Sequence, residues 1–286
     1  MNLKLAVLIK QVPDTAAVTP KAMKADGTLN RSALPAVFNP EDLNALEMAL
    51  QIKEKYGAGV TAVTMGPPAA AEILRDALFR GADRVFLLTD RKFAASDTLA
   101  TSTVLSRAIE KLGVFDIVIC GTQAIDGNTA QVGPQVAEKL NMNQLTYVEE
   151  IQSIDSGRIR VKRVIEDGKE TVESSLPVLL TVTGSANTPR PWSVKNIMKY
   201  KNAVTAQEVS EEKDINRLKQ KGLLIEMLSC EKIELDSSLC GIAGSPTMVK
   251  KIENVVRKGK EHKKIELTDD GITGLLTELI ADYTFD

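Results

Sequence analysis

The first 121 residues alternate two hydrophobic patterns. Short, continuous apolar runs predict buried strands at 3–10, 59–66, 84–90 and 115–121. Segments with apolar residues at helical spacing lie between them, at 40–57, 68–82 and 97–113. Strands that alternate with helices of this length run parallel and are joined by right-handed crossovers, with helices on both faces of the sheet. The pattern therefore predicts a three-layer α/β/α fold.

The pattern changes near residue 145. The stretch 145–183 is rich in β-branched residues and has a Ser-Gly pair at 156–157 and an Asp-Gly pair at 167–168, which favour tight turns. It predicts a β-meander added to the sheet edge, with an apolar strand after Pro177 that rejoins the core. The next residues, 184–200, predict an exposed loop and a short basic helix. We expect one domain over 1–200 and an extended C-terminal arm with charged helical segments over 201–286.

Three of the predicted strands end in residues that suit a ligand site. Ligands of parallel sheets bind at the carboxyl ends of the strands. These ends are Lys10–Asp14, Thr64–Pro68 and Gly121–Gly127. Taken singly, a Gly, Pro or Asp at such a place more often only ends a strand or caps a turn. Together, the three segments favour one crevice.

The most informative stretch is DGNTAQVGPQVA, residues 126–137. A buried strand that runs into a Gly- and amide-rich turn and then a helix points backbone N–H groups and a helix N-terminus at one spot, which is a general way to hold phosphate. We therefore expect a Rossmann-like nucleotide site. Where the helix begins stays open, because Pro134 suits a first helical turn but would disrupt a helix that already runs from Asn128.

Composition excludes several classes of function. The chain has 286 residues, of which 43% are apolar, enough for a sizeable core. A net charge of −2 and 4% aromatic residues argue against nucleic-acid binding. No apolar run approaches the roughly 18 residues of a membrane span, and the run at 5–9 lacks the cleavage site of a signal peptide. We expect no membrane span and a cytoplasmic location.

Cysteine and histidine offer no catalytic or metal pattern. Cys120, Cys230 and Cys240 are far apart in the sequence and form no CxxC motif, so we interpret them as reduced and structural. The single histidine, His262, lies among charged residues and is expected on an exposed helix. A Ser-His or metal-dependent hydrolase therefore has no basis in this sequence.

Residues 161–181, VKRVIEDGKETVESSLPVLLT, resemble the signature of the β subunit of electron transfer flavoproteins. In that signature a basic residue is followed by an acidic turn, a Glu, an aliphatic residue, and then Pro with an aliphatic pair. The matching positions are Arg163, Glu166, Asp167, Gly168, Glu170, Val172, Pro177, Leu179, Leu180 and Thr181. The segments KQVPD, NPEDLNALEMAL, TMGP, GADRV, GTQAIDG and PRPWSVKNIMKYK extend the resemblance to all but the last part of the chain.

The resemblance implies an adenine-nucleotide-binding domain that pairs with an electron transfer flavoprotein α subunit. In simple carriers of the family the β-subunit crevice holds AMP. In the electron-bifurcating branch, which DGNTAQVGP, QVPDT and NPEDLNALE resemble more, it holds a complete FAD. Such an FAD takes hydride from NADH and splits the electrons. One goes to ferredoxin or flavodoxin, and the other goes through the α-subunit FAD to a flavin-dependent dehydrogenase of acyl-CoA or hydroxy-acid type. The flavin carries the redox step, so no catalytic side chain is predicted.

The expected cofactor-binding residues come from the three strand ends and the start of the first helix. They are Leu8, Lys10, Pro13, Asp14, Asn39, Asp42, Met65, Gly66, Gly121, Gln123, Asp126, Gly127, Asn128, Thr129, Ala130, Gln131, Val132 and Gly133. The N–H groups of Gly127–Gln131 are expected to bind diphosphate, and the side chains of Asp126 and of polar residues in 128–131 to bind sugar hydroxyls. By resemblance, Asn39, Asp42 and 65–66 flank the adenosine, and Leu8, Lys10 and 13–14 lie toward the isoalloxazine.

The resemblance also assigns a partner-recognition loop to 184–200. Its expected contact residues are Trp192, Val194, Ile197 and Met198, with Val194 at the position of an aliphatic anchor whose burial contributes roughly 1.5–3 kcal/mol. The C-terminal arm is expected to pack on the α subunit.

Two alternatives stay open: a non-bifurcating carrier with structural AMP, and a stand-alone nucleotide-binding α/β protein that uses ATP. The sequence lacks the GxxxxGK[ST] phosphate loop that would favour the latter.

Overall fold

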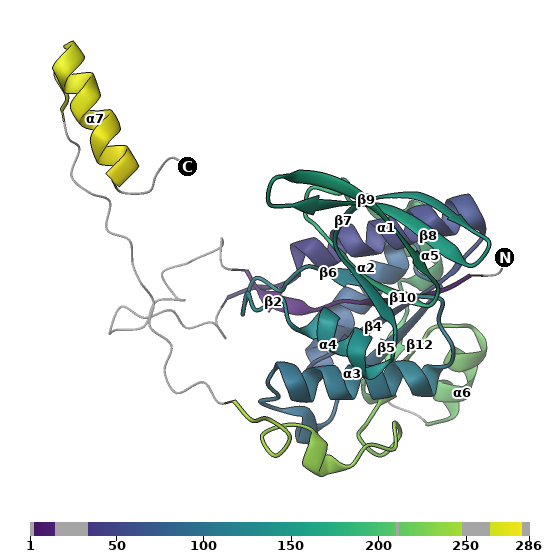
Figure 1. Cartoon of the computed structure of the whole chain (residues 1–286). Coiled ribbons are helices and arrows are strands. Elements are labelled where there is room, and N and C mark those ends of the chain that lie inside the picture. Colours follow the sequence, from purple (N-terminus) through teal and green to yellow (C-terminus); the bar gives the residue numbers. More distant parts are fainter. Residues whose placement is uncertain (1–2, 15–33, 210–211, 248–263, 282–286) are drawn as a thin grey trace, which may run out of the picture. The chain divides into compact units, whose positions relative to one another are not determined.

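The computed structural model describes residues 3–14, 34–209, 212–247 and 264–281. Within these ranges ten strands form one sheet in the order β11-β12-β5-β4-β1-β6-β10-β7-β8-β9 (Figure 1). The strands of the sheet are β1 Lys4–Leu8, β4 Gly59–Met65, β5 Arg84–Leu88, β6 Ile117–Gly121, β7 Asn143–Asp155, β8 Arg158–Ile165, β9 Gly168–Ser175, β10 Val178–Val182, β11 Val204–Thr205 and β12 Leu224–Leu228. A separate antiparallel pair consists of β2 Gln11–Pro13 and β3 Ala36–Phe38.

The predicted three-layer α/β/α arrangement is confirmed. The helices are α1 Pro40–Tyr56, α2 Ala71–Arg80, α3 Thr98–Leu112, α4 Val132–Lys139, α5 Val194–Tyr200, α6 Glu212–Gln220 and α7 Asp269–Ala281. Because side chains of a strand alternate between faces, Leu5 and Val7 of β1 pack with α1 and α2, whereas Ala6 and Leu8 pack with α3 and α4. Burial on both faces explains why β1 is a continuous apolar run.

Helix α1 begins and ends where its sequence predicts. Pro40 occupies the first turn, where a missing N–H costs no hydrogen bond. The helix ends at Gly57, which adopts the left-handed conformation (φ 70°) and donates its N–H to the carbonyl of Lys53. Helix α4 begins at Val132, so Pro134 lies in its first turn and the residues from Asn128 belong to the loop before it.

The meander joins the sheet as expected. Strands β8 and β9 pair antiparallel at the edge, after turns at 156–157 and 166–167. Strand β10 then returns to the interior of the sheet, between β6 and β7, and runs parallel to both. All five of its residues are buried, which explains the apolar run after Pro177.

The C-terminal region differs from the expected division at residue 200. Strand β12 pairs parallel with β5, and β11 pairs with β12, so the sheet includes residues from beyond 200. The chain accordingly divides into a unit over Met1–Lys250 and a second unit over Lys251–Asp286, of which α7 is the described helix. The predicted helix with the charged sequence SPTMVKKIENVVRKGKEH lies mostly outside the described residues, as does His262.

All three cysteines are buried and free. Cys230 and Cys240 bring their sulfurs to 3.9 Å, and burial raises the pKa of Cys240 to about 11. In the part of the chain that the structure describes, no three His, Cys, Asp or Glu side chains are placed to hold a metal ion. No described helix is long and apolar enough to cross a membrane.

Candidate functional site

A cavity of about 590 Å³ lies at the carboxyl ends of β1, β4 and β6. This is within the usual range of small-molecule sites, roughly 300–1,000 Å³. Most of the predicted cofactor residues line it: Leu8, Lys10, Asp42, Met65, Gly121, Gln123, Asp126, Gly127, Asn128, Thr129, Ala130, Gln131, Val132 and Gly133. The three strand ends therefore meet at one crevice, as their sequences indicated.

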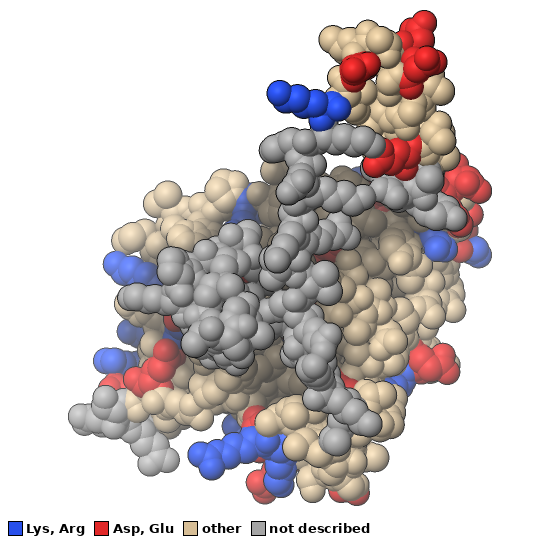
Figure 2. Space-filling view, turned by 90° about the vertical axis from the view of Figure 1, so that its left-hand side faces the viewer, with Lys and Arg blue, Asp and Glu red and all other residues tan. Residues whose placement is uncertain are grey.

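The edge of the sheet that carries the β1 end is on the left in Figure 1 and faces the viewer in Figure 2. On the part of this face that belongs to the first unit, basic and acidic side chains are interspersed, and neither sign dominates (Figure 2). The view shows no broad basic surface of the kind that attracts nucleic acid.

The loop between β6 and α4 has the shape of an anion-binding turn. Asn128 and Ala130 both adopt the left-handed conformation, each with φ 51°. Alternating backbone conformations of this kind turn successive N–H groups toward one side. A side chain built on Gly127 would meet no atom within 4 Å, so this residue borders open space. Left-handed non-glycine residues are strained and concentrate at functional sites.

The available donors begin later in the loop than the sequence suggested. The N–H groups of Gly127 and Asn128 both donate to the carbonyl of Ala124, at 3.2 and 2.8 Å, and close a turn. They are therefore already used. Among the described residues, the N–H groups of Thr129, Ala130 and Gln131 have no such bond, and they lead into the N-terminus of α4.

The start of α1 fixes the loop in place. Asn39 is fully buried; its side-chain amide donates to the carbonyl of Gln123 at 2.9 Å and its oxygen accepts the N–H of Ile125 at 3.1 Å. Glu41 accepts the N–H of Gln123 at 2.9 Å. Asn39 itself is not part of the cavity wall. The structure thus gives it a role in holding the loop.

Asp42 joins two strand ends. One carboxylate oxygen accepts the N–H of Gly121 at 3.0 Å, and the other accepts the N–H of Lys10 at 2.8 Å. Burial raises the pKa of Asp42 to about 7, even though these hydrogen bonds favour the ionised form. The carboxyl group therefore titrates near neutral pH at the base of the crevice.

This titration makes stability depend on pH. The ordinary pKa of 3.8 applies in the unfolded chain, so between about pH 4 and 7 the folded chain binds more protons, and stability falls as pH rises. We compare the unfolding free energies of the nucleotide-free wild type and Asp42→Asn. From pH 5 to pH 8 we expect the value for the wild type minus that for the variant to fall by about 2 kcal/mol, since one pKa unit corresponds to about 1.4 kcal/mol. Urea titrations of both proteins at the two pH values measure this difference.

A matched control removes a carboxylate elsewhere. Asp116 accepts the N–H of Lys4 at the opposite end of β1, at 2.7 Å, so Asp116→Asn has a comparable local change without touching the crevice. Parallel stability curves for the wild type and Asp42→Asn over pH 5–8 would contradict the placement of the titrating group at Asp42.

One wall of the crevice was missed by sequence reasoning. The loop between β5 and α3 contributes Phe93, Ala95, Ser96 and Asp97, and α3 adds Thr98, Thr101 and Leu105. The chain order offered a signal, because β5 is a parallel strand between β4 and β12 and its carboxyl end must lie at the same edge. The segment RKFAASDT directly follows that end and contains the N-cap Asp97.

Residues 240–247, which belong to the C-terminal part of the chain, hold this wall in place through hydrogen bonds. Thr247 donates its N–H and hydroxyl to Asp97 at 3.1 and 2.7 Å, and the hydroxyl of Ser245 accepts the N–H of Asp97 at 2.8 Å. Gly241 donates its N–H to the hydroxyl of Ser96 at 3.0 Å. Thr247 also lines the cavity. The segment placed in an arm by its sequence therefore completes the site.

The remaining predicted cofactor residues are placed outside the cavity wall. Pro13 is in β2 and Asp14 follows it; Asp14 donates its N–H to the carbonyl of Pro35, which ties this segment to β3. Gly66 donates its N–H to Leu88 at the end of β5, and a side chain there would meet Ala70 at 3.0 Å. Gly66 thus allows a close approach between the strand end and the segment before α2.

The expected partner-recognition loop is fastened to α1 and displays apolar side chains. Arg190 forms ion pairs with the carboxylates of Glu47 at 2.7 Å and Glu54 at 2.5 Å, and Asn44 and Asn187 exchange hydrogen bonds. The exposed side chains are Trp192, Val194 and Met198, which are 52%, 75% and 61% exposed, whereas Ile197 is half-buried. Trp192 packs edge-on against Phe79 of α2. The loop presents its apolar residues on a fixed base.

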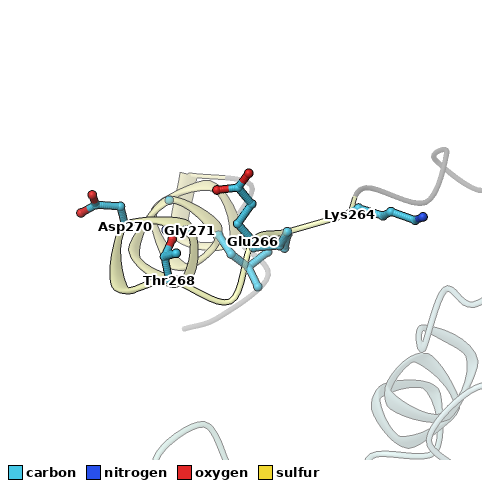
Figure 3. Close-up of a pocket in the computed structure, with 8 residues that line it drawn as sticks. Lys264, Glu266, Thr268, Asp270 and Gly271 are labelled. Carbon is cyan, nitrogen blue, oxygen red and sulfur yellow. Dashed lines mark hydrogen bonds between the residues drawn. The ribbon is translucent and has the colours of Figure 1, made fainter.

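A second pocket, at the start of α7, has a different character (Figure 3). Its lining comes from residues 264–275 alone, and Lys264, Glu266 and Asp270 extend away from one another rather than toward a common centre (Figure 3). A site that binds a small molecule surrounds most of the ligand's surface. We assign no function to this pocket.

Comparisons with known proteins agree on one family. The family model described as the electron transfer flavoprotein domain matches residues 26–212. An electron transfer flavoprotein subunit beta from Thermoanaerobacterium thermosaccharolyticum is 45% identical over 247 residues, 86% of either chain. The caffeyl-CoA reductase-Etf complex subunit CarD of Acetobacterium woodii is 40% identical over 98% of either chain. The acryloyl-CoA reductase electron transfer subunit gamma of Anaerotignum propionicum is 40% identical over 92% of this chain and 96% of its own.

Proposed function

Since this chain belongs to the electron transfer flavoprotein family, as a β-type subunit, we propose that it holds FAD in the crevice and acts in an electron-bifurcating heterodimer with an α subunit. When bound, the FAD would accept hydride from NADH and divide its electrons between ferredoxin or flavodoxin and, through the α-subunit FAD, a partner dehydrogenase. The observation that carries the proposal is the crevice itself, with an anion-binding turn on one side and apolar side chains on the other.

The chain's own residues suit the parts of such a cofactor. The N–H groups of Thr129 to Gln131 are oriented for a diphosphate, and the side chains of Gln131 and Thr98, which bond each other at 2.9 Å, suit sugar hydroxyls. Leu8, Phe93 and Leu105 form an apolar surface that would exclude water from a ring system. The adenine of AMP and the isoalloxazine of FAD would both suit this surface, and the preference for FAD comes from the resemblance of DGNTAQVGP and QVPDT to the bifurcating branch.

The names of two relatives bear on the kind of partner dehydrogenase. Two of the similar proteins are named as parts of acryloyl-CoA reductase and caffeyl-CoA reductase systems. This supports a partner of acyl-CoA type over one of hydroxy-acid type. The exposed residues Trp192, Val194 and Met198 supply the apolar surface on which such a partner would dock.

Cofactor analysis of the co-expressed heterodimer tests the proposal. We expect two FAD per heterodimer and NADH oxidation that proceeds only when a low-potential acceptor and the partner dehydrogenase are both present. One FAD together with one AMP would overturn it and assign the chain to the non-bifurcating carriers. Flavin and nucleotide are measured after denaturation, so this result does not depend on finding the right dehydrogenase.

A charge at the recognition loop should disrupt docking alone. For Val194→Asp we expect the KM for the partner dehydrogenase to rise at least about tenfold, because burial of such a side chain is worth roughly 1.5–3 kcal/mol. Flavin content should not change, since Val194 is not part of the crevice wall. Val114→Asp is the matched control: Val114 is 82% exposed, but it follows α3, which covers the other face of the sheet from α2 and α5. Equal effects of the two variants would refute a docking role for Val194.

A further inference from the structure

An ion pair spans the crevice. The ammonium of Lys10, at the end of β1, contacts both carboxylate oxygens of Asp126 in the β6–α4 loop, at 2.8 and 2.7 Å. The Lys10 side chain is 46% exposed and that of Asp126 is 25% exposed, so the pair can be reached by a ligand. Both residues belong to the cavity wall.

The backbone on each side of the pair is fixed by α1. Lys10 donates its N–H to Asp42 at 2.8 Å and accepts the N–H of Asn39 at 2.9 Å. On the other side, Asn39 holds the loop just before Asp126 through its bonds to 123 and 125. The backbone at both ends of the ion pair is therefore fixed, which keeps the two side chains within reach of each other.

The pair decides the charge that an anionic ligand meets. Among the described residues that line the cavity, Lys10 is the sole Lys, Arg or His, whereas Asp42, Asp97 and Asp126 all carry carboxyl groups. A phosphate that enters the crevice is attracted to a single ammonium, and Asp126 already neutralises that ammonium. Backbone N–H groups supply the rest of the attraction.

We propose that Asp126 competes with the ligand's phosphate for Lys10 and so lowers the affinity of the crevice for phosphate-bearing ligands in general. Inorganic phosphates, which gain little besides the charge interaction, bind weakly because they have to displace the carboxylate. A nucleotide bound through additional contacts displaces it and then pairs with Lys10. The inference rests on the proposed function in taking the ligand to be a phosphate-bearing nucleotide, but it does not depend on whether that nucleotide is FAD or AMP.

From the sequence, Asp126 is expected to bind sugar hydroxyls. That role and the competing role predict opposite changes in ligand affinity when the carboxylate is removed. If Asp126 accepts hydrogen bonds from the ligand, its loss weakens binding. If it competes for Lys10, Asp126→Asn releases the ammonium and tightens binding. The amide keeps the size of the side chain, so the two roles can be separated by one isosteric change.

Calorimetric titration of the nucleotide-free full chain with AMP and with pyrophosphate tests the inference. We expect Asp126→Asn to bind both probes about fivefold tighter than the wild type, since exposed ion pairs are worth up to about 1 kcal/mol. Lys10→Met should weaken both, and adding Asp126→Asn to Lys10→Met should change nothing further. Glu138→Gln, an exposed residue of α4 outside the cavity wall, controls for the loss of one negative charge and should match the wild type.

Three outcomes would overturn the inference. The first is weaker AMP binding by Asp126→Asn. The second is equal tightening with and without Lys10, which would indicate general repulsion by the carboxylate. The third is an absence of pyrophosphate binding in both the wild type and Asp126→Asn. Failure of the proposed function is a separate result, because AMP in place of the second FAD in the purified heterodimer leaves the sign of the Asp126→Asn effect unchanged.

Discussion

Replacing Gly121 by alanine is expected to destabilise the fold by about 3 kcal/mol or more, the upper part of the range for overpacked sites. A Cβ at Gly121 would lie 2.7 Å from a carboxylate oxygen of Asp42 and 2.8 Å from the backbone carbonyl carbon of Glu41. The second contact cannot be relieved by a side-chain rotation, because it involves the first turn of α1. Helix α1 would have to move away from β6, and the bond from Gly121 to Asp42 would be lost. Chemical denaturation of the purified chain measures the effect.

A second glycine of the same segment is the control. Gly127 has open space around its Cβ direction and no left-handed φ, so Gly127→Ala should change stability by less than about 0.5 kcal/mol. Equal midpoints for Gly121→Ala and the wild type would show that α1 does not pack as closely on β6 as described. The pair of substitutions thus separates a packing glycine from a ligand-facing one.

Replacing Gly127 by tryptophan is expected to empty the crevice while leaving the fold intact. The indole would enter the open space beside the anion-binding turn, where the phosphates would approach the backbone. We expect the heterodimer to retain the α-subunit flavin and to lose the β-site flavin, so that the flavin content falls from two to one per heterodimer. Flavin absorbance after denaturation measures this.

The matched control places the same bulk elsewhere. Gly59, at the amino end of β4, also has open space on its Cβ side, with no atom within 4 Å of the position that a Cβ would take, and it is at the other edge of the sheet. Gly59→Trp should keep both flavins. Loss of both flavins, or of neither, in Gly127→Trp would contradict the assignment of this turn to the cofactor.

Local patterns were sufficient for the parallel core and the meander of the first 200 residues, but they did not reveal the short pair of β2 and β3. Each strand of the parallel core is buried on both faces, so its apolar run is continuous and easily distinguished from the helices. The return of β10 to the interior was visible because its five residues are apolar or β-branched and follow Pro177. Strand β12 was not visible, since its residues are mostly half-buried and its partner β5 is far away in the sequence. Pairing between distant segments leaves no local periodicity.

The site was predictable where a strand end carried a turn sequence and unpredictable where it did not. Residues 121–133 combine glycines, amides and a helix start, and the structure places them around the crevice. The wall that includes Phe93 and Asp97 looks like an ordinary helix start, because Asp97 caps α3 in the usual way through the N–H of Ala100. Asn39 was predicted to lie beside the ligand, but its burial and its bonds to the loop reveal a positioning role that a sequence does not specify.

The bonds between Thr247 and Asp97 join residues 150 positions apart. During translation, the β5–α3 loop emerges from the ribosome long before the residue that braces it. The parallel core can assemble around β1, β4 and β6 while synthesis continues, but the crevice has no complete wall until residue 247 has left the exit tunnel. A ligand therefore meets the complete crevice only after nearly all of the first unit has been synthesised.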